Sequence, residues 1–408
     1  MQRVPRSVVA GIAAFGVTLL VSRFRATPYD NYVLLAQALL AGHTWITWPG
    51  RYIDALLYHG HYYVIEAPLP AVLLLPFVAI FGGANQTLLA VALAGVAIGA
   101  AWELGERFGV SPEANVWICG FLLAGTDLLW CAMLGDVWFV AHVSAVAFTM
   151  LALVELVGKR RGWLVALWAA CAFESRFSMV LALPVYLYML MRGDILVIPS
   201  RSTAPPRGVL ATGSTPREAH LSIARRAAID FIAMLVPIAV LWVLYNEARW
   251  GTWSDVGYTM WYHQDQVGMP TGSPFRLAYL PSQLYSFFVQ TPVWIGVYPW
   301  LVPTYSGVAL TFTSPALVLA FLAKRPMSLV WPLWIAAFLT AGPNFLYYVN
   351  GFAQFGMRHA LDFEPFLIAL VMLAARERLP RWGMALIAYS MLVGFWGCWY
   401  WNTFVRQQ

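Results

Sequence analysis

Residues 28–42 read PYDNYVLLAQALLAG, and a single acid, Asp30, opens this stretch just after the first long apolar segment. The apolar residues that follow recur at helical spacing: Val33, Leu34, Ala36, Leu39 and Leu40. This pattern predicts a short amphipathic helix that lies along a membrane surface, with a carboxylate at its start. Asp30 would then either cap that helix or serve as a base close to lipid, and the residue alone leaves both interpretations open.

The composition places this stretch in an all-α, polytopic membrane protein. Hydrophobic residues make up 61% of the chain, charged residues 11%, and the mean hydropathy is +0.67. Many apolar runs approach the roughly 20 residues that cross a bilayer. The four cysteines stand in apolar runs without CxxC spacing, which indicates neither a metal cluster nor a disulfide framework. The net charge of +6 is dispersed over membrane-flanking loops, so the expected partner is membrane lipid and not nucleic acid.

Charged residues at the ends of the apolar runs divide the chain into about 11 predicted transmembrane helices. With a cytoplasmic N-terminus, 17 of the 25 Lys and Arg residues fall on the inside, as the positive-inside rule requires. A multi-pass protein of the plasma (inner) membrane is therefore expected. The predicted spans are 8–22, 86–106, 114–134, 138–157, 162–174, 177–191, 227–246, 305–322, 328–349, 360–375 and 382–401.

The chain is predicted to form one transmembrane domain, 1–408, whose polar residues lie mainly in loops on the external side of the membrane. Residues 67–82 are apolar but short and contain three prolines, so we expect a re-entrant or surface-lying helix there. This helix would close a first external loop at 23–85, and a second long external loop follows at 247–304. Residues 192–226, which are rich in Pro, Ser, Thr, Gly and Arg, predict a flexible cytoplasmic loop.

Two acids are the candidate catalytic residues. Asp136 follows Gly135 at a turn between two predicted spans, so it should reach the same outer face as Asp30. Two carboxylates from separate segments could then share one site. The alternative is that Asp136 caps the next helix, in which His142 is expected to be a buried partner of a polar neighbour.

Aromatic and polar residues of the two external loops suggest a sugar site. Aromatic faces pack on the C–H faces of a pyranose, while carboxylates and amides bind its hydroxyl groups. The alternative is the belt of Trp and Tyr that gathers at membrane interfaces. The candidate substrate-binding residues are Tyr63 and Glu66 in the first loop and Tyr258, Trp261, His263 and Asp265 in the second.

Arg358 and Arg276 are the candidates for binding a phosphate, because a guanidinium binds phosphate bidentately and keeps its charge near lipid. Alternatively, Arg358 snorkels or pairs with Asp362, one helical turn along. The spacings His59-x-His61 and His263-x-Asp265 could serve a divalent metal, but such spacings are common by chance. No metal site and no other cofactor is therefore predicted, and a divalent metal remains a minor alternative.

Several stretches together resemble the membrane glycosyltransferases of the GT-C superfamily, in particular the branch of protein O-mannosyltransferases and lipid A aminoarabinose transferases. They are YDNYVLLAQALLAG (29–42), GHYYVIEAPLPAVLLLPFVAIFG (60–82), AAWELGERFG (100–109), LGDVWFVAHVSAVAFTMLALVELVGKRR (134–161) and FGMRHALDFEPFLIAL (355–370). Two departures are that His359 stands where an aromatic residue is common, and that no soluble domain is appended as in some relatives.

The resemblance implies a GT-C-type fold, a polyprenyl-phosphate-linked sugar donor, and inversion at the anomeric carbon with Asp30 in the place of the catalytic acid. The acceptor would be a hydroxyl group of a lipid, glycan or protein at the outer face. Phosphate leaves without a general acid, so one base suffices, with Asp136 orienting the acceptor or the sugar. The rival hypothesis is a transporter or flippase of a lipid-linked sugar, since Asp127, Glu155 and Glu174 lie within or near spans. The sequence identifies neither the sugar nor the acceptor.

Overall fold

The computed structural model describes residues 4–192, 216–264 and 271–406, and within them nearly all regular structure is helical. In chain order the helices are α1 (Arg6–Val21), α2 (Asn31–Leu40), α3 (Leu69–Phe81), α4 (Gln86–Phe108), α5 (Pro112–Ala124), α6 (Leu128–Leu134), α7 (Val137–Val157), α8 (Gly162–Phe173), α9 (Leu183–Met191), α10 (Pro216–Trp250), α11 (Gly257–Gln264), α12 (Leu280–Phe288), α13 (Leu310–Thr313), α14 (Met327–Leu346), α15 (Glu364–Ala374) and α16 (Arg381–Tyr400). Shorter helical turns are η1 (Phe177–Ala182), η2 (Leu277–Tyr279), η3 (Pro315–Leu322), η4 (Arg358–Asp362) and η5 (Trp401–Val405). Two antiparallel hairpins pair β1 (Leu56–Tyr58) with β2 (His61–Tyr63) and β3 (Val293–Trp294) with β4 (Leu301–Val302).

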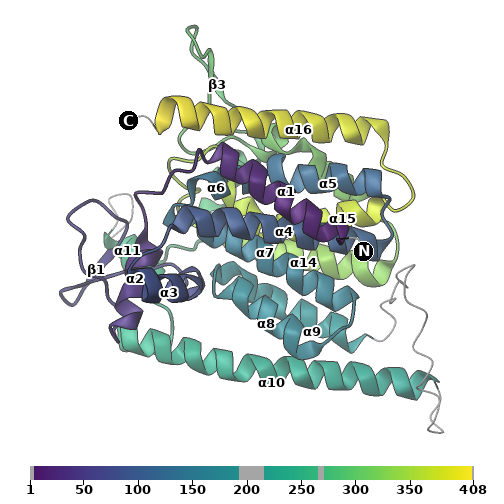
Figure 1. The fold of residues 1–408 in the computed structure, drawn as a ribbon, viewed down its shortest axis with the longest axis horizontal. Helices are drawn as coiled ribbons and strands as arrows, with labels where there is room; N and C mark the ends of the chain where they lie inside the picture. Colours follow the sequence, from purple (N-terminus) through teal and green to yellow (C-terminus); the bar gives the residue numbers. More distant parts are fainter. Residues whose placement is uncertain (1–3, 193–215, 265–270, 407–408) are drawn as a thin grey trace.

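The long helices run roughly side by side, with α10 and α16 on opposite flanks of the bundle (Figure 1). Five helices in the described part of the chain are long and apolar enough to cross a membrane, or six if the bent pair α5 and α6 is one span. Each of the 11 predicted spans overlaps a helical segment, but 305–322 contains mostly the 3-10 helix η3, and α8 has only 12 residues, or about 18 Å at 1.5 Å per residue. The prediction of a helical, multi-pass protein is confirmed, and the number of spans stays a prediction.

The core of the bundle is α4 and α7, whose candidate spans are 67% and 83% buried within the protein. α1 approaches α4 closely because glycines face each other across the contact. A Cβ atom on Gly95 would lie 2.9 Å from the carbonyl oxygen of Gly11, and one on Gly11 would meet Gly95 equally closely. Small residues allow this approach, which is a common way for membrane helices to pack.

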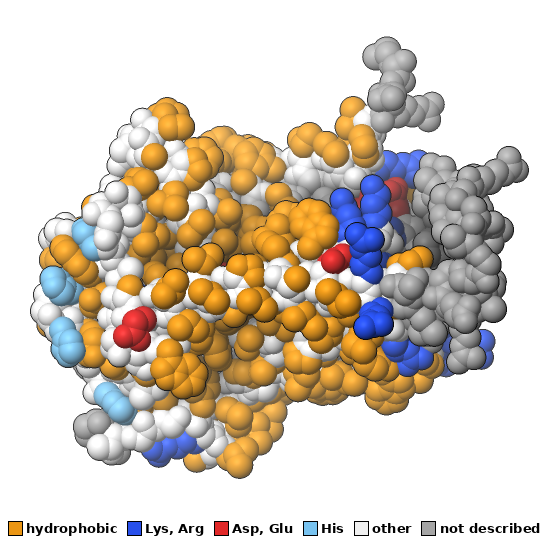
Figure 2. Space-filling view, turned by 90° about the horizontal axis from the view of Figure 1, so that it is seen from below, with side chains coloured by type: hydrophobic (Ala, Val, Ile, Leu, Met, Phe, Trp, Pro, Cys, Tyr) orange, Lys and Arg blue, Asp and Glu red, His pale blue; other side chains and the backbone are white. Residues whose placement is uncertain are grey.

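α2, α3, α11 and the β1–β2 hairpin gather at one end of the bundle (Figure 1). α3 corresponds to the short apolar run at 67–82; with 13 residues it is not one of the candidate spans, and it packs against α2. Gln37 of α2 donates from Nε2 to the carbonyl of Gly82 at 3.0 Å. Seen from below, Lys and Arg side chains lie mostly toward the opposite end, while His side chains lie at this one (Figure 2).

Two of the predicted loops contain more structure than expected. Most of the loop predicted for 192–226 lies outside the described residues, but its last part, from Pro216 on, belongs to α10. Proline at the first helical position and the helix-favouring residues after it explain this early start. The second predicted loop, 247–304, contains α11, α12 and the β3–β4 hairpin, because short apolar and polar patterns in it were too brief to separate from loop.

Candidate active site

The segments that carry Asp30 and Asp136 are tied together at the start of α4. Gln86 donates from Nε2 to the carbonyls of Tyr29 at 3.1 Å and Gly135 at 2.7 Å. Its amide oxygen accepts from the backbone N–H of Tyr32 at 3.0 Å. One buried glutamine therefore joins residues that are about a hundred positions apart, and the two acids reach the same end of the bundle.

Asp30 stands at the N-cap position of α2, but its side chain makes no capping hydrogen bond. Instead, Oδ1 accepts from Nη2 of Arg51 at 2.6 Å, and Arg51 also contacts the carbonyl of Pro28. The Asp30 side chain is 28% exposed. The interpretation of Asp30 as a side-chain cap is therefore wrong, and its carboxylate is paired with an arginine and partly exposed.

Asp136 makes no capping hydrogen bond either, although it stands at the N-cap of α7. Its carboxylate accepts from the hydroxyl of Thr27, whose backbone N–H in turn donates to Thr87 Oγ1 at 3.0 Å. Burial raises the pKa of Asp136 to about 6, against the lowering effects of the Thr27 hydrogen bond and of Arg406. Asp136 thus fixes the segment that leads into Asp30.

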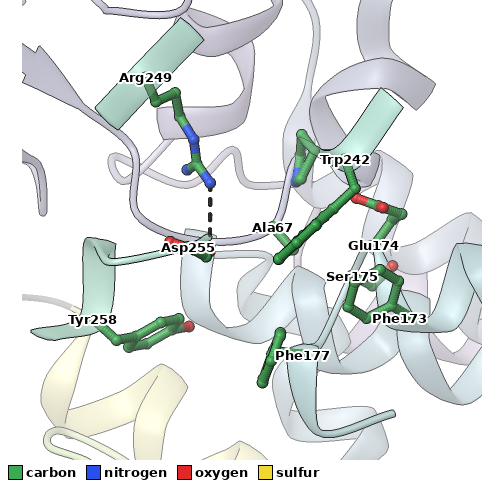
Figure 3. A pocket seen from close by; sticks show the side chains of 10 residues that line it. Ala67, Phe173, Glu174, Ser175, Phe177, Trp242, Arg249, Asp255 and Tyr258 are labelled. Carbon is green, nitrogen blue, oxygen red and sulfur yellow. Dashed lines mark hydrogen bonds and ion pairs between the residues drawn. The ribbon is translucent and has the colours of Figure 1, made fainter. Parts of the chain in front are cut away.

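A pocket opens between α10, the end of α8 and η1, and Figure 3 shows its lining. Its apolar part comes from Ala67, Pro68, Phe173, Phe177 and Trp242. Its polar part comes from Glu174, Ser175, Arg249, Asp255 and Tyr258. Arg249 donates from Nη2 to Asp255 at 3.4 Å and to Asn246 at 2.9 Å, and its Nε has no partner among the described residues. A buried guanidinium beside a wall of aromatic rings suits a phosphate on a lipid chain.

Glu66 directly precedes Ala67 and Pro68 of the pocket lining and is buried, with 5% of the residue exposed. Oε2 has no hydrogen-bond partner among the described residues. The pKa of Glu66 is raised to about 8, mainly by burial and also by the charge of Asp54, against the lowering effects of a backbone hydrogen bond and of the guanidinium groups of Arg176 and Arg249. A pKa of about 8 keeps Glu66 mostly protonated at pH 7, and the protonated acid can donate a hydrogen bond to a ligand.

The raised pKa of Glu66 predicts that stability decreases as pH rises. Between about pH 4.5, where the unfolded side chain ionises, and about pH 8, the folded state binds one proton more than the unfolded state, so the free energy of unfolding decreases with pH. In the Glu66→Gln variant this contribution is absent. We expect the apparent Tm of the wild type to decrease from pH 5 to pH 8 relative to that of Glu66→Gln, measured in the same detergent. Parallel curves would contradict the assignment.

The other candidate substrate-binding residues differ in how far they are buried. Tyr258 lines the pocket, and Tyr63 is buried against Trp250 at a centroid distance of 5.1 Å. Trp261 is half-buried beside the same cluster, while His263 is exposed and bonds through Nε2 to the carbonyl of Gly272 at 2.9 Å. Asp265 lies outside the described residues. None of the described residues form a group of three or more His, Cys, Asp and Glu that could hold a metal ion.

The two predicted phosphate ligands lie away from the pocket lining. Arg276 is exposed at the surface, whereas Arg358 is buried, with its guanidinium carbon 5.3 Å from the ring centroid of Phe139. Arg358 does not pair with Asp362, because η4 is a 3-10 helix and residues four apart do not share a face there. Sequence reasoning did not select Arg249, whose only signal is a basic residue at the end of an apolar run.

Sequence reasoning also missed a buried polar centre around Asp362, which has no exposed surface. His142 Nδ1 lies 2.9 Å from Oδ1, which confirms that His142 is a buried partner of a polar neighbour. Arg176 binds both oxygens, at 3.2 and 3.1 Å, and Ser178 and Asn344 donate to Oδ2 at 2.6 and 3.0 Å. The centre joins α7, η1, α14 and η4. It also fixes Arg176, whose charge acts on Glu66.

No protein-family model and no curated protein sequence matches the chain. Among solved structures, the fold matches ArnT from Cupriavidus metallidurans bound to undecaprenyl phosphate, with a TM-score of 0.51 and 15% sequence identity. The match covers 95% of this chain and 62% of ArnT, so the chain spans about three fifths of its length. The chain is thus a multi-pass membrane protein with the GT-C-type fold of ArnT.

Proposed function

We propose that this protein is an inverting glycosyltransferase that moves a sugar from a polyprenyl-phosphate donor to an acceptor hydroxyl at the outer face of the membrane. The observation that carries the proposal is the Asp30 carboxylate, which leaves the helix N-terminus uncapped and stays partly exposed at the end of a GT-C-type bundle. Asp30 stands where an acid usually caps a helix, yet its carboxylate is not used for that bond. The predominance of basic side chains toward the other end supports an external location for this one.

In the proposed reaction, the acceptor oxygen attacks the anomeric carbon from the face opposite the phosphate. A C–O bond forms to the acceptor, while the bond between the anomeric carbon and the phosphate oxygen breaks and leaves its electron pair on the phosphate. Asp30 takes the proton of the acceptor hydroxyl. The products are the glycosylated acceptor and polyprenyl phosphate, and the proton leaves Asp30 to solvent before the next turnover.

The pocket beside α10 is the proposed site of the donor phosphate. Phe177 is 50% exposed, so a polyprenyl chain could lie against the aromatic wall while its phosphate meets Arg249. Arg249 is preorganised, because its guanidinium stacks 4.2 Å from the ring centroid of Tyr245 and 4.8 Å from that of Trp250. Its charge would stabilise the charge that develops on the leaving phosphate. Tyr258 and neutral Glu66 would bind sugar hydroxyl groups.

Replacing Arg249 by glutamine is expected to weaken donor use by about 10- to 100-fold in kcat/KM, the equivalent of one charge-assisted hydrogen bond of roughly 1.5–3 kcal/mol. Arg276→Gln is the matched control, because Arg276 is exposed and lies outside the pocket lining. The measurement is the initial rate of polyprenyl phosphate release against donor concentration. A larger loss in Arg276→Gln than in Arg249→Gln would move the phosphate site to the second external loop.

The proposed function is tested with purified protein in vesicles and a panel of polyprenyl-phosphate sugars. Release of polyprenyl phosphate together with a glycosylated acceptor is the expected result. The rival hypothesis, a transporter or flippase, gains support from Asp127 and Glu364, which are buried within the bundle and each carry an oxygen without a hydrogen-bond partner. Movement of the labelled lipid-linked sugar across the bilayer without release of polyprenyl phosphate would favour that rival.

A further inference from the structure

The β3–β4 hairpin projects sideways from the bundle, beyond α16, whereas the β1–β2 hairpin extends from the end of the bundle (Figure 1). The backbone of the turn is closed by a hydrogen bond from the N–H of Ile295 to the carbonyl of Trp300 at 2.8 Å. Each strand has only two residues. The hairpin is therefore a short arm at the side of the molecule, built from residues 293–302.

The side chains of this arm are apolar and exposed. Trp294 is 70% exposed, Val297 64% and Tyr298 59%. An aromatic surface of this kind needs a partner, because leaving it in water forgoes about 25 cal/mol for each Å² that could be buried. Most of the surface of each of these three side chains is left uncovered by the described part of the chain.

The sequence around the arm indicates what that partner is. No Asp, Glu, Lys or Arg occurs from Leu277 to Ala323. A surface that docks a soluble protein usually has a polar, partly charged rim, whereas Trp and Tyr without charges are typical of a bilayer interface. The exposed backbone groups of such short strands exclude the hydrocarbon core, where they would be unsatisfied, and are satisfied in the hydrated headgroup region.

The arm also lies next to a lipid-facing surface. Tyr298 packs on Trp399 and Phe404, with ring centroids 6.4 and 5.8 Å apart. Both of these residues belong to the C-terminal part of the candidate span Arg381–Val405. Leu392 of the same span is 69% exposed, as a residue in contact with acyl chains would be. The arm therefore lies beside the C-terminal end of this candidate span, next to the exposed apolar surface of α16.

We propose that the β3–β4 hairpin is a lipid-binding arm, which lies in the bilayer interface of the leaflet that meets the C-terminal end of α16. Trp294, Val297 and Tyr298 rest between lipid headgroups and the upper acyl chains. This inference stands on the exposure, composition and position of the arm, and it is independent of the proposed enzymatic activity.

The test places a bimane fluorophore on a single introduced cysteine in the arm, Val297→Cys, in the full-length protein in phosphatidylcholine vesicles. The native Cys119, Cys131 and Cys398 are buried and stay, while the partly exposed Cys171 is replaced by alanine. Leu57→Cys is the matched control, because Leu57 is an apolar residue of the other hairpin and is 48% exposed. Trp294→Cys is a second arm position in case Val297→Cys does not fold.

Lipids with brominated acyl chains are expected to quench the fluorophore on the arm several-fold more than the one at Leu57→Cys. Aqueous iodide should quench in the reverse order. Strong iodide quenching with no effect of brominated lipid at both arm positions would overturn the proposal, because the arm would then lie in water. Protection from both quenchers would overturn it too, because a protein surface, such as a second copy of the chain, would then cover the arm.

Discussion

The Asp30→Asn variant is expected to lose sugar transfer by about 100- to 10,000-fold in kcat, the usual contribution of a positioned general base. Asparagine keeps the size of the side chain and an oxygen that can accept from Arg51, but it cannot take the acceptor proton. Because Asp30 makes no capping hydrogen bond, the substitution removes no backbone contact of α2. The measurement is polyprenyl phosphate release by wild type and variant in the same vesicles, with equal amounts of folded protein.

The apparent Tm shows whether the Asp30→Asn variant loses activity because its base is missing or because it unfolds. Arg51 and Asp30 form a partly exposed pair, with side chains 42% and 28% exposed, and such pairs contribute about 0–1 kcal/mol. The apparent Tm of Asp30→Asn should therefore stay close to that of the wild type. Glu103→Gln is a matched control, since Glu103 also pairs with an arginine, Arg107 at 2.9 Å, far from the site in sequence. If Asp30→Asn keeps its activity, the base lies elsewhere, and Asp136→Asn becomes the next variant to measure.

The Asp362→Ala variant is expected to be the most destabilising single change, by about 3–5 kcal/mol, the usual cost of removing one partner of a buried ion pair. It leaves Arg176 without the carboxylate that Nε and Nη2 of its guanidinium contact. It also removes the acceptor of Ser178 and Asn344. The apparent Tm and the amount of monodisperse protein after solubilisation are the measurements.

A second substitution tests the physical reason for this loss. Replacing the buried cation as well, in Asp362→Ala/Arg176→Met, removes the uncompensated charge and is expected to recover part of the stability. The Glu103→Ala variant breaks a surface pair and should change the apparent Tm far less. If the double variant is less stable than Asp362→Ala, then Arg176 stabilises the fold through contacts other than this carboxylate.

Much of the architecture could be predicted from the sequence because its signals are local. Helical hydrophobic periodicity and the ends of apolar runs place α4, α7, α14 and α16 to within a few residues. The same local sequence signals predicted that Asp30 lies at the start of α2 and Asp136 at the start of α7. Local pattern could not tell whether these acids cap their helices, because capping depends on competing partners such as Arg51 and Thr27 from other segments.

The sequence by itself determined that this is a multi-pass helical membrane protein with a lone acid after its first apolar segment. Only the tertiary structure decided which polar groups meet. Arg176 and Asp362 are 186 residues apart, and Arg249 reaches the pocket beside Glu174 only because α10 packs along α8. Side chains at such separations are brought together by the packing of whole helices, to which each residue contributes little. Spacing along the chain therefore identifies candidates for chemistry, and packing selects among them.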